Sequence, residues 1–205
     1  MATPVSADPL LTAENLSLSR GYRTLFENLS FNVCAGDLLQ IVGANGTGKT
    51  SLMRILAGLS RFGFEGRLEC SVPLLYVAHQ SSVKALLTPR ENLCWHLSGE
   101  GHYSHGEIDA ALARVGLQGY EDVLSHSLSA GQHRRVNLAR LYLTEATLWL
   151  LDEPFTAIDR HGVEALESHV KAHCANGGAV VFVSHQPMQT STGVRTLELK
   201  AGSST

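Results

Sequence analysis

Short apolar runs recur along the chain, and each of them ends in polar residues. Four runs have the length of a strand and stay apolar at nearly every position: Leu38–Val42, Leu74–Val77, Leu148–Leu151 and Ala179–Val183. Strands that are covered by helices on both faces show this pattern. Because helical patterns separate the runs, the sequence predicts an α/β fold with a mostly parallel core sheet.

Two other stretches have different periodicities. Near the N-terminus, Leu16–Leu18 and Leu29–Val33 alternate apolar and polar residues, which predicts a small antiparallel sheet. Between the second and third apolar runs, helical spacing dominates, as in Ile108, Ala111, Leu112 and Val115. We therefore expect a single domain over residues 1–205, with an inserted α-helical arm over about residues 82–128.

Composition narrows the classes of partner. The chain has 205 residues, of which 44% are apolar, and its formal net charge is −3. This charge argues against a nucleic-acid-binding protein, whose surface is basic. No uninterrupted apolar run is longer than Ala179–Val183, which is far shorter than the roughly 20 residues that cross a bilayer. We therefore expect no nucleic acid as partner and contact with a membrane only through other proteins.

The segment between the first apolar run and the next helical pattern fits G-x-x-x-x-G-K-[ST], a phosphate-binding loop. The helix is expected from Thr50 to about Leu59. Its N-terminus and the inward backbone N–H groups favour phosphate. Lys49 is expected to reach the β- and γ-phosphates, and the Thr50 hydroxyl to bind Mg²⁺. The predicted phosphate-binding residues are Gly43, Ala44, Asn45, Gly46, Thr47, Gly48, Lys49, Thr50 and Ser51.

Two carboxylates follow the run Leu148–Leu151. A carboxylate at the C-terminal end of a strand is placed to hold Mg²⁺, and we assign this role to Asp152. Glu153 is then the candidate general base for the attacking water. A solvated acidic turn is the alternative, but a phosphate loop earlier in the chain argues against it.

A third segment, Leu128–Gln132, precedes a basic helix that we expect to begin at His133. Small residues before a helix make an anion-binding N-terminus. Taken alone, the same residues fit an ordinary N-cap and turn equally well.

The order of these motifs resembles the nucleotide-binding subunit of ATP-binding-cassette (ABC) transporters, over nearly the whole chain. The matching segments are residues 43–50, Gln80, Leu128–Gln132, Leu148–Glu153, Thr156–Asp159 and His185. The resemblance implies the P-loop NTPase fold of ABC ATPases and the cofactors ATP and Mg²⁺. It also implies a second copy of the chain as partner, because such subunits close face to face around two ATP molecules.

The resemblance also implies roles for single residues. Ser129, Gly131 and Gln132 would meet the nucleotide held by the other copy. Gln80 would contact Mg²⁺ or the water and sense the membrane partner. His185 would hold the γ-phosphate and, with Lys49 and Glu153, complete the catalytic set.

Each of these roles has a plainer alternative. Gln80 also fits a surface residue after a strand, and His185 also fits an ordinary polar side chain. Asp159, which the resemblance places at the dimer interface, also fits a helix N-cap.

Four stretches narrow the resemblance to the cytochrome c maturation branch of the family: 87–93, 128–136, 139–159 and 185–187. In this branch Ala130 replaces the commoner glycine. The branch implies an ATP hydrolase that powers haem export or haem delivery to a periplasmic haem chaperone. It implies integral membrane partners of the CcmB and CcmC type and a peripheral position at the cytoplasmic face of the bacterial inner membrane. The ATPase subunit of a different ABC exporter is the alternative.

Two further assignments stay open. Tyr22 is a candidate for stacking on adenine, but it also fits a turn residue, and Arg20 fits the stacking position as well. The segment Ser81–Leu97 is a candidate contact with the membrane partner. Its apolar residues could equally form the small core of the helical arm; they are Leu86, Leu87, Leu93 and Trp95.

Overall fold

The computed structural model describes residues 8–60, 62–97, 103–185, 188 and 193–200. The chain forms two compact units. The first, which we call the core unit, comprises Met1–Tyr76, Ala146–Asp152 and His169–Thr205. The second, the helical unit, comprises Val77–Glu145 and Glu153–Ser168. The expectation of one domain with an arm over about residues 82–128 stays a prediction.

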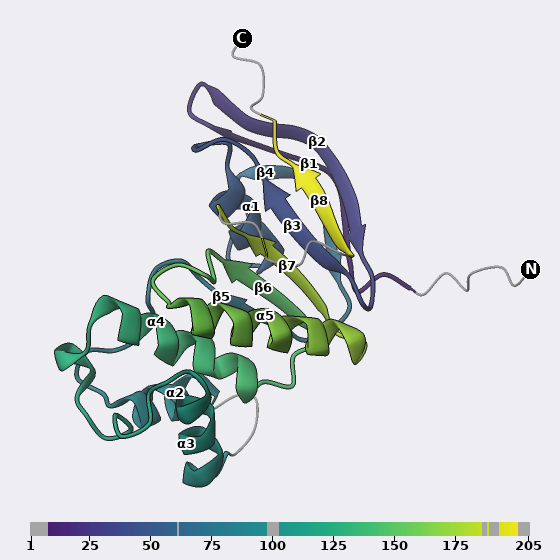
Figure 1. Ribbon diagram of the computed structural model, residues 1–205. Helices are drawn as coiled ribbons and strands as arrows, with labels where there is room; N and C mark the ends of the chain where they lie inside the picture. The colour runs from purple at the N-terminus through teal and green to yellow at the C-terminus, as the bar shows by residue number, and fades with distance from the viewer. Residues whose placement is uncertain (1–7, 61, 98–102, 186–187, 189–192, 201–205) are drawn as a thin grey trace, which may run out of the picture. The chain divides into compact units, whose positions relative to one another are not determined.

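The strands labelled in Figure 1 form two sheets. The smaller sheet has the order β2-β1-β4, and its strands are β1 (Leu11–Arg20), β2 (Arg23–Val33) and β4 (Phe64–Cys70). The larger sheet has the order β5-β6-β7-β3-β8. Its strands are β3 (Leu38–Val42), β5 (Leu74–Val77), β6 (Leu148–Asp152), β7 (Ala179–Val183) and β8 (Val194–Glu198).

The four apolar runs are confirmed as β3, β5, β6 and β7. Strands β6 and β7 are buried at every residue, as helix-covered strands should be. The pairs β3–β7, β3–β8 and β6–β7 are parallel, whereas β1 pairs antiparallel with both β2 and β4. The predicted combination of a parallel core sheet and a small antiparallel sheet is therefore confirmed.

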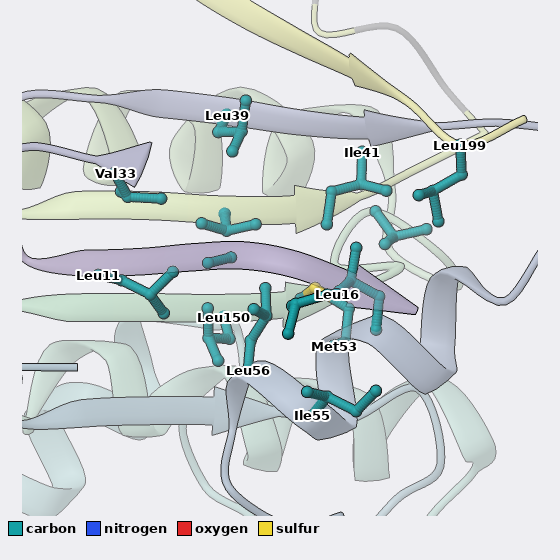
Figure 2. Close-up of a cluster of buried hydrophobic side chains, with 14 of the residues drawn as sticks. Leu11, Leu16, Val33, Leu39, Ile41, Met53, Ile55, Leu56, Leu150 and Leu199 are labelled. Carbon is teal, nitrogen blue, oxygen red and sulfur yellow. The ribbon is translucent and has the colours of Figure 1, made fainter. Parts of the chain in front are cut away.

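Both sheets share one apolar core within the core unit. Helix α1 (Lys49–Leu56) buries Leu52, Met53, Ile55 and Leu56 in it. Figure 2 shows Leu11 and Leu16 of β1 in the same cluster as Met53 and Leu56 of α1 and Leu150 of β6. Burial of these side chains fixes the strand–loop–helix turn that carries the phosphate-binding motif.

The helical unit has a separate core. It contains α2 (Pro89–Leu97), α3 (His105–Arg114), α4 (Ala130–Ala139), the 3₁₀ turns Ser125–Ser127 and Arg140–Tyr142, and the first part of α5 (Arg160–Ala175). The helical spacing predicted around Ile108 is confirmed, because Ile108, Ala111 and Leu112 of α3 are buried in this core. Across the described part of the chain, no helix combines the length and the apolar character needed to cross a membrane.

Candidate nucleotide-binding site

The phosphate-binding motif joins β3 to α1 and depends on glycine at two positions. Gly43 has φ +152°, and a methyl group there would lie 2.6 Å from the carbonyl oxygen of Leu199. Gly48 caps α1 with φ +96°, a left-handed conformation that other residues rarely adopt. The backbone of the loop therefore follows a path that only glycine allows at these two points.

Polar side chains hold the loop from within. The Lys49 ammonium donates to the carbonyl oxygens of Gly43 at 2.7 Å and Ala44 at 3.0 Å. The Thr47 hydroxyl, which is buried, donates to Ala44 at 2.9 Å. Helix α1 begins at Lys49, one residue before the predicted start, so Thr50 lies in its first turn. Lys49 is thus placed over the loop, beside the backbone that a phosphate would contact.

The register of the parallel sheet brings the other predicted residues of the core unit to the same edge. Asp152 pairs with Val183, and Val183 pairs with Ile41, so the three residues lie in one row. Gly43 and His185 each follow this row by two residues. Asp152 is 1% exposed, whereas His185 is exposed. The phosphate loop, Asp152 and His185 therefore meet at the carboxyl edge of the sheet, where ligands of α/β proteins bind.

Glu153 follows Asp152 directly and has an unusual backbone. Its φ is +53°, a conformation that costs a residue with a side chain on the order of 1–3 kcal/mol. Its carbonyl oxygen accepts a hydrogen bond from Arg134 Nη2 at 2.8 Å. Such strain is common at functional sites, so the geometry is compatible with the predicted role of Glu153 as general base.

Gln80 lies in an exposed segment of the helical unit, just after β5. The same Arg134 donates through Nη1 to the carbonyl oxygen of Ala78 at 2.6 Å. Sequence reasoning did not single out Arg134, because its acceptors lie far from it along the chain and are backbone atoms. Its burial shows only in the structure, where Arg134 is 6% exposed, a rare state for an arginine.

Helix α4 begins at Ala130, so the prediction that the basic helix begins at His133 is wrong. Ser129 is its N-cap: the Ser129 hydroxyl accepts from the Gln132 N–H at 3.2 Å, and Gln132 Oε1 accepts from the Ser129 N–H at 2.8 Å. This capping box extends the helix by one turn. The N-cap alternative is therefore confirmed, while Ser129 itself stays exposed.

Gly131 lies in the first turn of α4. A small residue fits there because another segment of the helical unit comes close to it. A methyl group there would be 3.0 Å from the carbonyl oxygen of Ala157. Asp159, nearby in the chain, caps α5 by accepting from the Gly162 N–H at 2.8 Å, and it pairs with Arg135 at 2.9 Å. The Gly162 N–H and Arg135 lower the pKa of Asp159, which keeps this cap ionised. The N-cap alternative for Asp159 is confirmed.

Tyr22 is fully exposed in the turn between β1 and β2, as the turn alternative expects. Its stacking on adenine stays a prediction. A neighbouring residue that sequence reasoning missed, Arg23, lies beside the phosphate loop: a methyl group at Gly46 would lie 3.7 Å from its guanidinium. This position of Arg23 depends on the pairing of β2, which no local motif indicates.

The segment Ser81–Leu97 divides between core and surface. Leu93 is completely buried in the core of the helical unit, which confirms the core alternative for this residue. Leu86 and Trp95 are 81% and 60% exposed. Arg90 bonds both Asp109 and Asp122, and these carboxylates raise its pKa above the ordinary value. Arg90 of α2 therefore links this helix to α3 and to the segment around Asp122 within the helical unit.

Comparison with known proteins now decides the family. The sequence profile named ABC transporter matches residues 26–156, which include the phosphate loop, Gln80, the start of α4 and Glu153. The chain belongs to the ABC transporter family. Within it, the chain is 45% identical to the cytochrome c biogenesis ATP-binding export protein CcmA of Pseudomonas syringae pv. tomato, over 96% of this chain and 98% of that protein.

Other relatives place it in the same branch of the ABC transporters. CcmA of Pseudomonas putida KT2440 is 48% identical over 92% of this chain and 96% of that protein. CcmA of Shewanella oneidensis is 48% identical over 92% of each chain. The chain is thus a CcmA-type ABC ATPase, and the resemblance drawn from its motifs is confirmed.

Solved structures confirm the ABC ATPase fold. The ATP-binding cassette MJ0796, in a dimeric post-hydrolysis state bound to ADP and Pi, has a TM-score of 0.82 and 23% identity over 93% of this chain and 94% of its own. The ATP-binding subunit of another ABC transporter also has a TM-score of 0.82, at 19% identity over 94% of this chain and 89% of its own. The P-loop NTPase class predicted from the sequence is therefore confirmed.

Proposed function

We propose that this chain is the ATP-hydrolysing subunit of a membrane ABC complex for cytochrome c biogenesis, and that it powers haem export or haem delivery to a periplasmic haem chaperone. The observation that carries the ATPase assignment is the shared sheet edge of the phosphate loop, the buried Asp152 and His185. The names of the CcmA relatives support the biogenesis and export role. The ATPase subunit of a different exporter is the alternative.

The chain's own groups perform phosphoryl transfer to water mainly by positioning and charge stabilisation. The loop N–H groups and Lys49 bind the phosphates and offset their charge. His185 donates to the γ-phosphate and orients the water. Glu153 takes the proton of that water as it attacks. In the helical unit, the exposed Gln80 senses the state of the membrane partner.

The residues assigned to Mg²⁺ supply the ligands that this ion prefers. A hydroxyl from Thr50, a carboxylate from Asp152 and an amide oxygen from Gln80 are all hard oxygen donors. Asp152, at 1% exposure, adds a fixed negative charge at the sheet edge. When bound, Mg²⁺ offsets the negative charge of the β- and γ-phosphates.

A second copy of the chain completes the site. Ser129, Gly131 and Gln132 stand at the N-terminus of a ten-residue helix, and this end carries partial positive charge toward an anion. Within one copy they belong to the helical unit, whereas the phosphate loop belongs to the core unit. We assign them to the γ-phosphate bound by the other copy, in an ATP-sandwich dimer.

The membrane partners are integral subunits of the CcmB and CcmC type, and the chain is peripheral at the cytoplasmic face of the inner membrane. Exposed apolar side chains of the helical unit support a docking surface: Leu86, Trp95, Tyr120, Val123 and Leu124. We call these five residues the apolar patch. Backbone hydrogen bonds from Ser125 to Leu87 and from His126 to Ala85 bring the segment around Leu124 beside the segment around Leu86. Exposed apolar side chains that gather in this way mark a protein contact.

Replacement of the general base tests the proposed function. Glu153→Gln keeps the size of the side chain but cannot accept the proton, so kcat should fall about 10²-fold or more. ATP affinity should stay within about threefold, because the phosphate loop is unchanged. Lys49→Ala serves as the opposite case and should lose nucleotide binding itself.

Single-turnover hydrolysis and equilibrium binding of a fluorescent ATP analogue separate the two variants. Hydrolysis at the parent rate by Glu153→Gln would overturn the assignment of the base.

A further inference from the structure

Two buried polar side chains of α4 contact the chain on both sides of Gln80. Arg134 Nη1 donates to the Ala78 carbonyl oxygen at 2.6 Å. Asn137 Nδ2 donates to Ser81 Oγ at 3.2 Å, and Asn137 Oδ1 accepts from Ser82 Oγ at 3.0 Å. The two side chains are three residues apart on the helix and therefore share one face. They are 6% and 2% exposed, so the segment around Gln80 is held from inside the helical unit.

The same guanidinium holds a second functional segment. Arg134 Nη2 donates to the Glu153 carbonyl oxygen at 2.8 Å. Guanidinium is planar, and its N–H groups point in fixed directions. The carbonyl groups of Ala78 and Glu153 are therefore kept at one mutual distance and orientation. Glu153 has φ +53°, and a backbone in this region persists only where its surroundings hold it.

We propose that Arg134 is a positioning residue for ATP hydrolysis: it fixes the Glu153 backbone and the segment leading to Gln80 through one guanidinium. The inference rests on the proposed function, and it deepens the assignment of the general base. Arg134 acts through the two backbone carbonyls. A displacement of the Gln80 segment changes the hydrogen bond to Ala78 and, through the rigid guanidinium, the one to Glu153.

The contacts favour this role over a contribution to stability alone. Burying a guanidinium costs more desolvation free energy than burying an apolar side chain of similar volume. If α4 needed only good packing, an apolar side chain at this position would stabilise it more. Arg114, by contrast, is exposed on α3 of the same unit, 5.6 Å from the ring of Tyr142. It therefore serves as a control for the loss of an arginine from the surface of this unit.

Steady-state kinetics of the full chain test the proposal with Arg134→Met, Arg134→Lys and the control Arg114→Met. Methionine keeps much of the length but removes the donors, so kcat should fall about tenfold or more while KM for ATP stays within about twofold. Arg134→Lys keeps the charge but lacks the two N–H groups that reach both carbonyl oxygens at once, so the kcat of this variant should lie between those of the parent and Arg134→Met. Arg114→Met should match the parent in both constants.

Amide hydrogen exchange gives a readout that does not depend on hydrolysis. In Arg134→Met, exchange should speed up in residues 78–82 and 153–157 together, with α3 unchanged. Faster exchange across the whole helical unit would show a general structural role and overturn the proposal. So would an unchanged kcat, or faster exchange in only one of the two segments. A parent chain without ATPase activity would overturn the proposed function, and the exchange result would still decide the role of Arg134.

Discussion

Backbone conformation restricts which residue can occupy the start of the phosphate loop. Gly43 has φ +152° and faces the Leu199 carbonyl oxygen, so an added methyl group meets both strain and a clash. Gly177 has φ +90° but nothing within 4 Å of the same position. A substitution at Gly177 therefore tests backbone strain alone, whereas one at Gly43 tests strain together with a steric clash.

We expect Gly43→Ala to lower the free energy of unfolding by about 2–4 kcal/mol and Gly177→Ala by about 1 kcal/mol. ATP affinity should fall about tenfold or more only for Gly43→Ala, because only there does the loop move. Urea denaturation and nucleotide titration measure both effects. Equal losses of stability for the two variants would contradict the clash with Leu199.

A half-buried histidine gives the core unit a pH dependence. The His173 ring stacks on Trp149 with centroids 3.7 Å apart, and its Nε2 lies 3.0 Å from the Thr147 carbonyl oxygen. Burial lowers the pKa of His173 below its ordinary value, with a smaller contribution from His169. The neutral ring is therefore the form that the fold prefers.

The sign of the effect follows from proton binding. As the pH falls through about 6.5, the unfolded chain takes up a proton at His173 before the folded chain does, so the free energy of unfolding decreases. Above that pH the residue has no effect. His173→Phe keeps an aromatic ring on Trp149 and should lose this part of the pH dependence. Urea denaturation of both proteins at about pH 5.5 and 7.5 tests it, and identical pH dependences would refute it.

At the scale of elements, the sequence predicted those strands whose stability comes from burial. The runs that became β6 and β7 are buried at every residue, and their apolar character is visible without any partner. Strands β4 and β8 were missed because they lie at sheet edges with mostly exposed side chains. Their backbone hydrogen bonds to β1 and β3 define them, and these depend on residues far away in the chain.

The same distinction holds in the site. The places of the phosphate loop and Asp152 at the sheet edge could be predicted because each follows a local pattern: a glycine-rich turn after a strand, or a carboxylate at a strand end. Arg134 was not, because its role depends on carbonyl oxygens at Ala78 and Glu153 that only the fold brings to it. The start of α4 was placed too late because its capping box with Gln132 was not recognised.

If the apolar patch is the docking surface, a charge placed in it should weaken binding of the membrane subunits. The buried Asn92 donates to the carbonyl oxygens of Lys84, Leu87 and Thr88, which holds the turn that presents Leu86. Leu86→Asp places a charge on a side chain that is 81% exposed, so stability should change by less than about 0.5 kcal/mol. Capture of CcmB- and CcmC-type subunits from detergent extracts should fall about tenfold.

Leu59→Asp is the matched control, since Leu59 is 60% exposed but belongs to the core unit. It should leave capture unchanged. Equal capture by the parent and Leu86→Asp would remove the apolar patch as the docking surface. Capture of an unrelated membrane exporter would favour the alternative function.

At the scale of the whole molecule, the proposed mechanism needs two chains. Within one chain, the phosphate loop and His185 belong to one compact unit, and Ser129 and Gly131 belong to the other. In the proposed mechanism, a second copy supplies its own α4 N-terminus to the bound triphosphate, which would make ATP itself part of the interface. Dimerisation should therefore depend on bound nucleotide and be reversed by hydrolysis.

The most direct test of this central claim is the mass of Glu153→Gln in solution, measured by light scattering with and without ATP and Mg²⁺. Because this variant binds ATP but does not hydrolyse it, we predict twice the mass of one chain with nucleotide and a single chain without it. Lys49→Ala should stay a single chain in both conditions. A single-chain mass for Glu153→Gln under conditions where it is saturated with ATP would contradict the account.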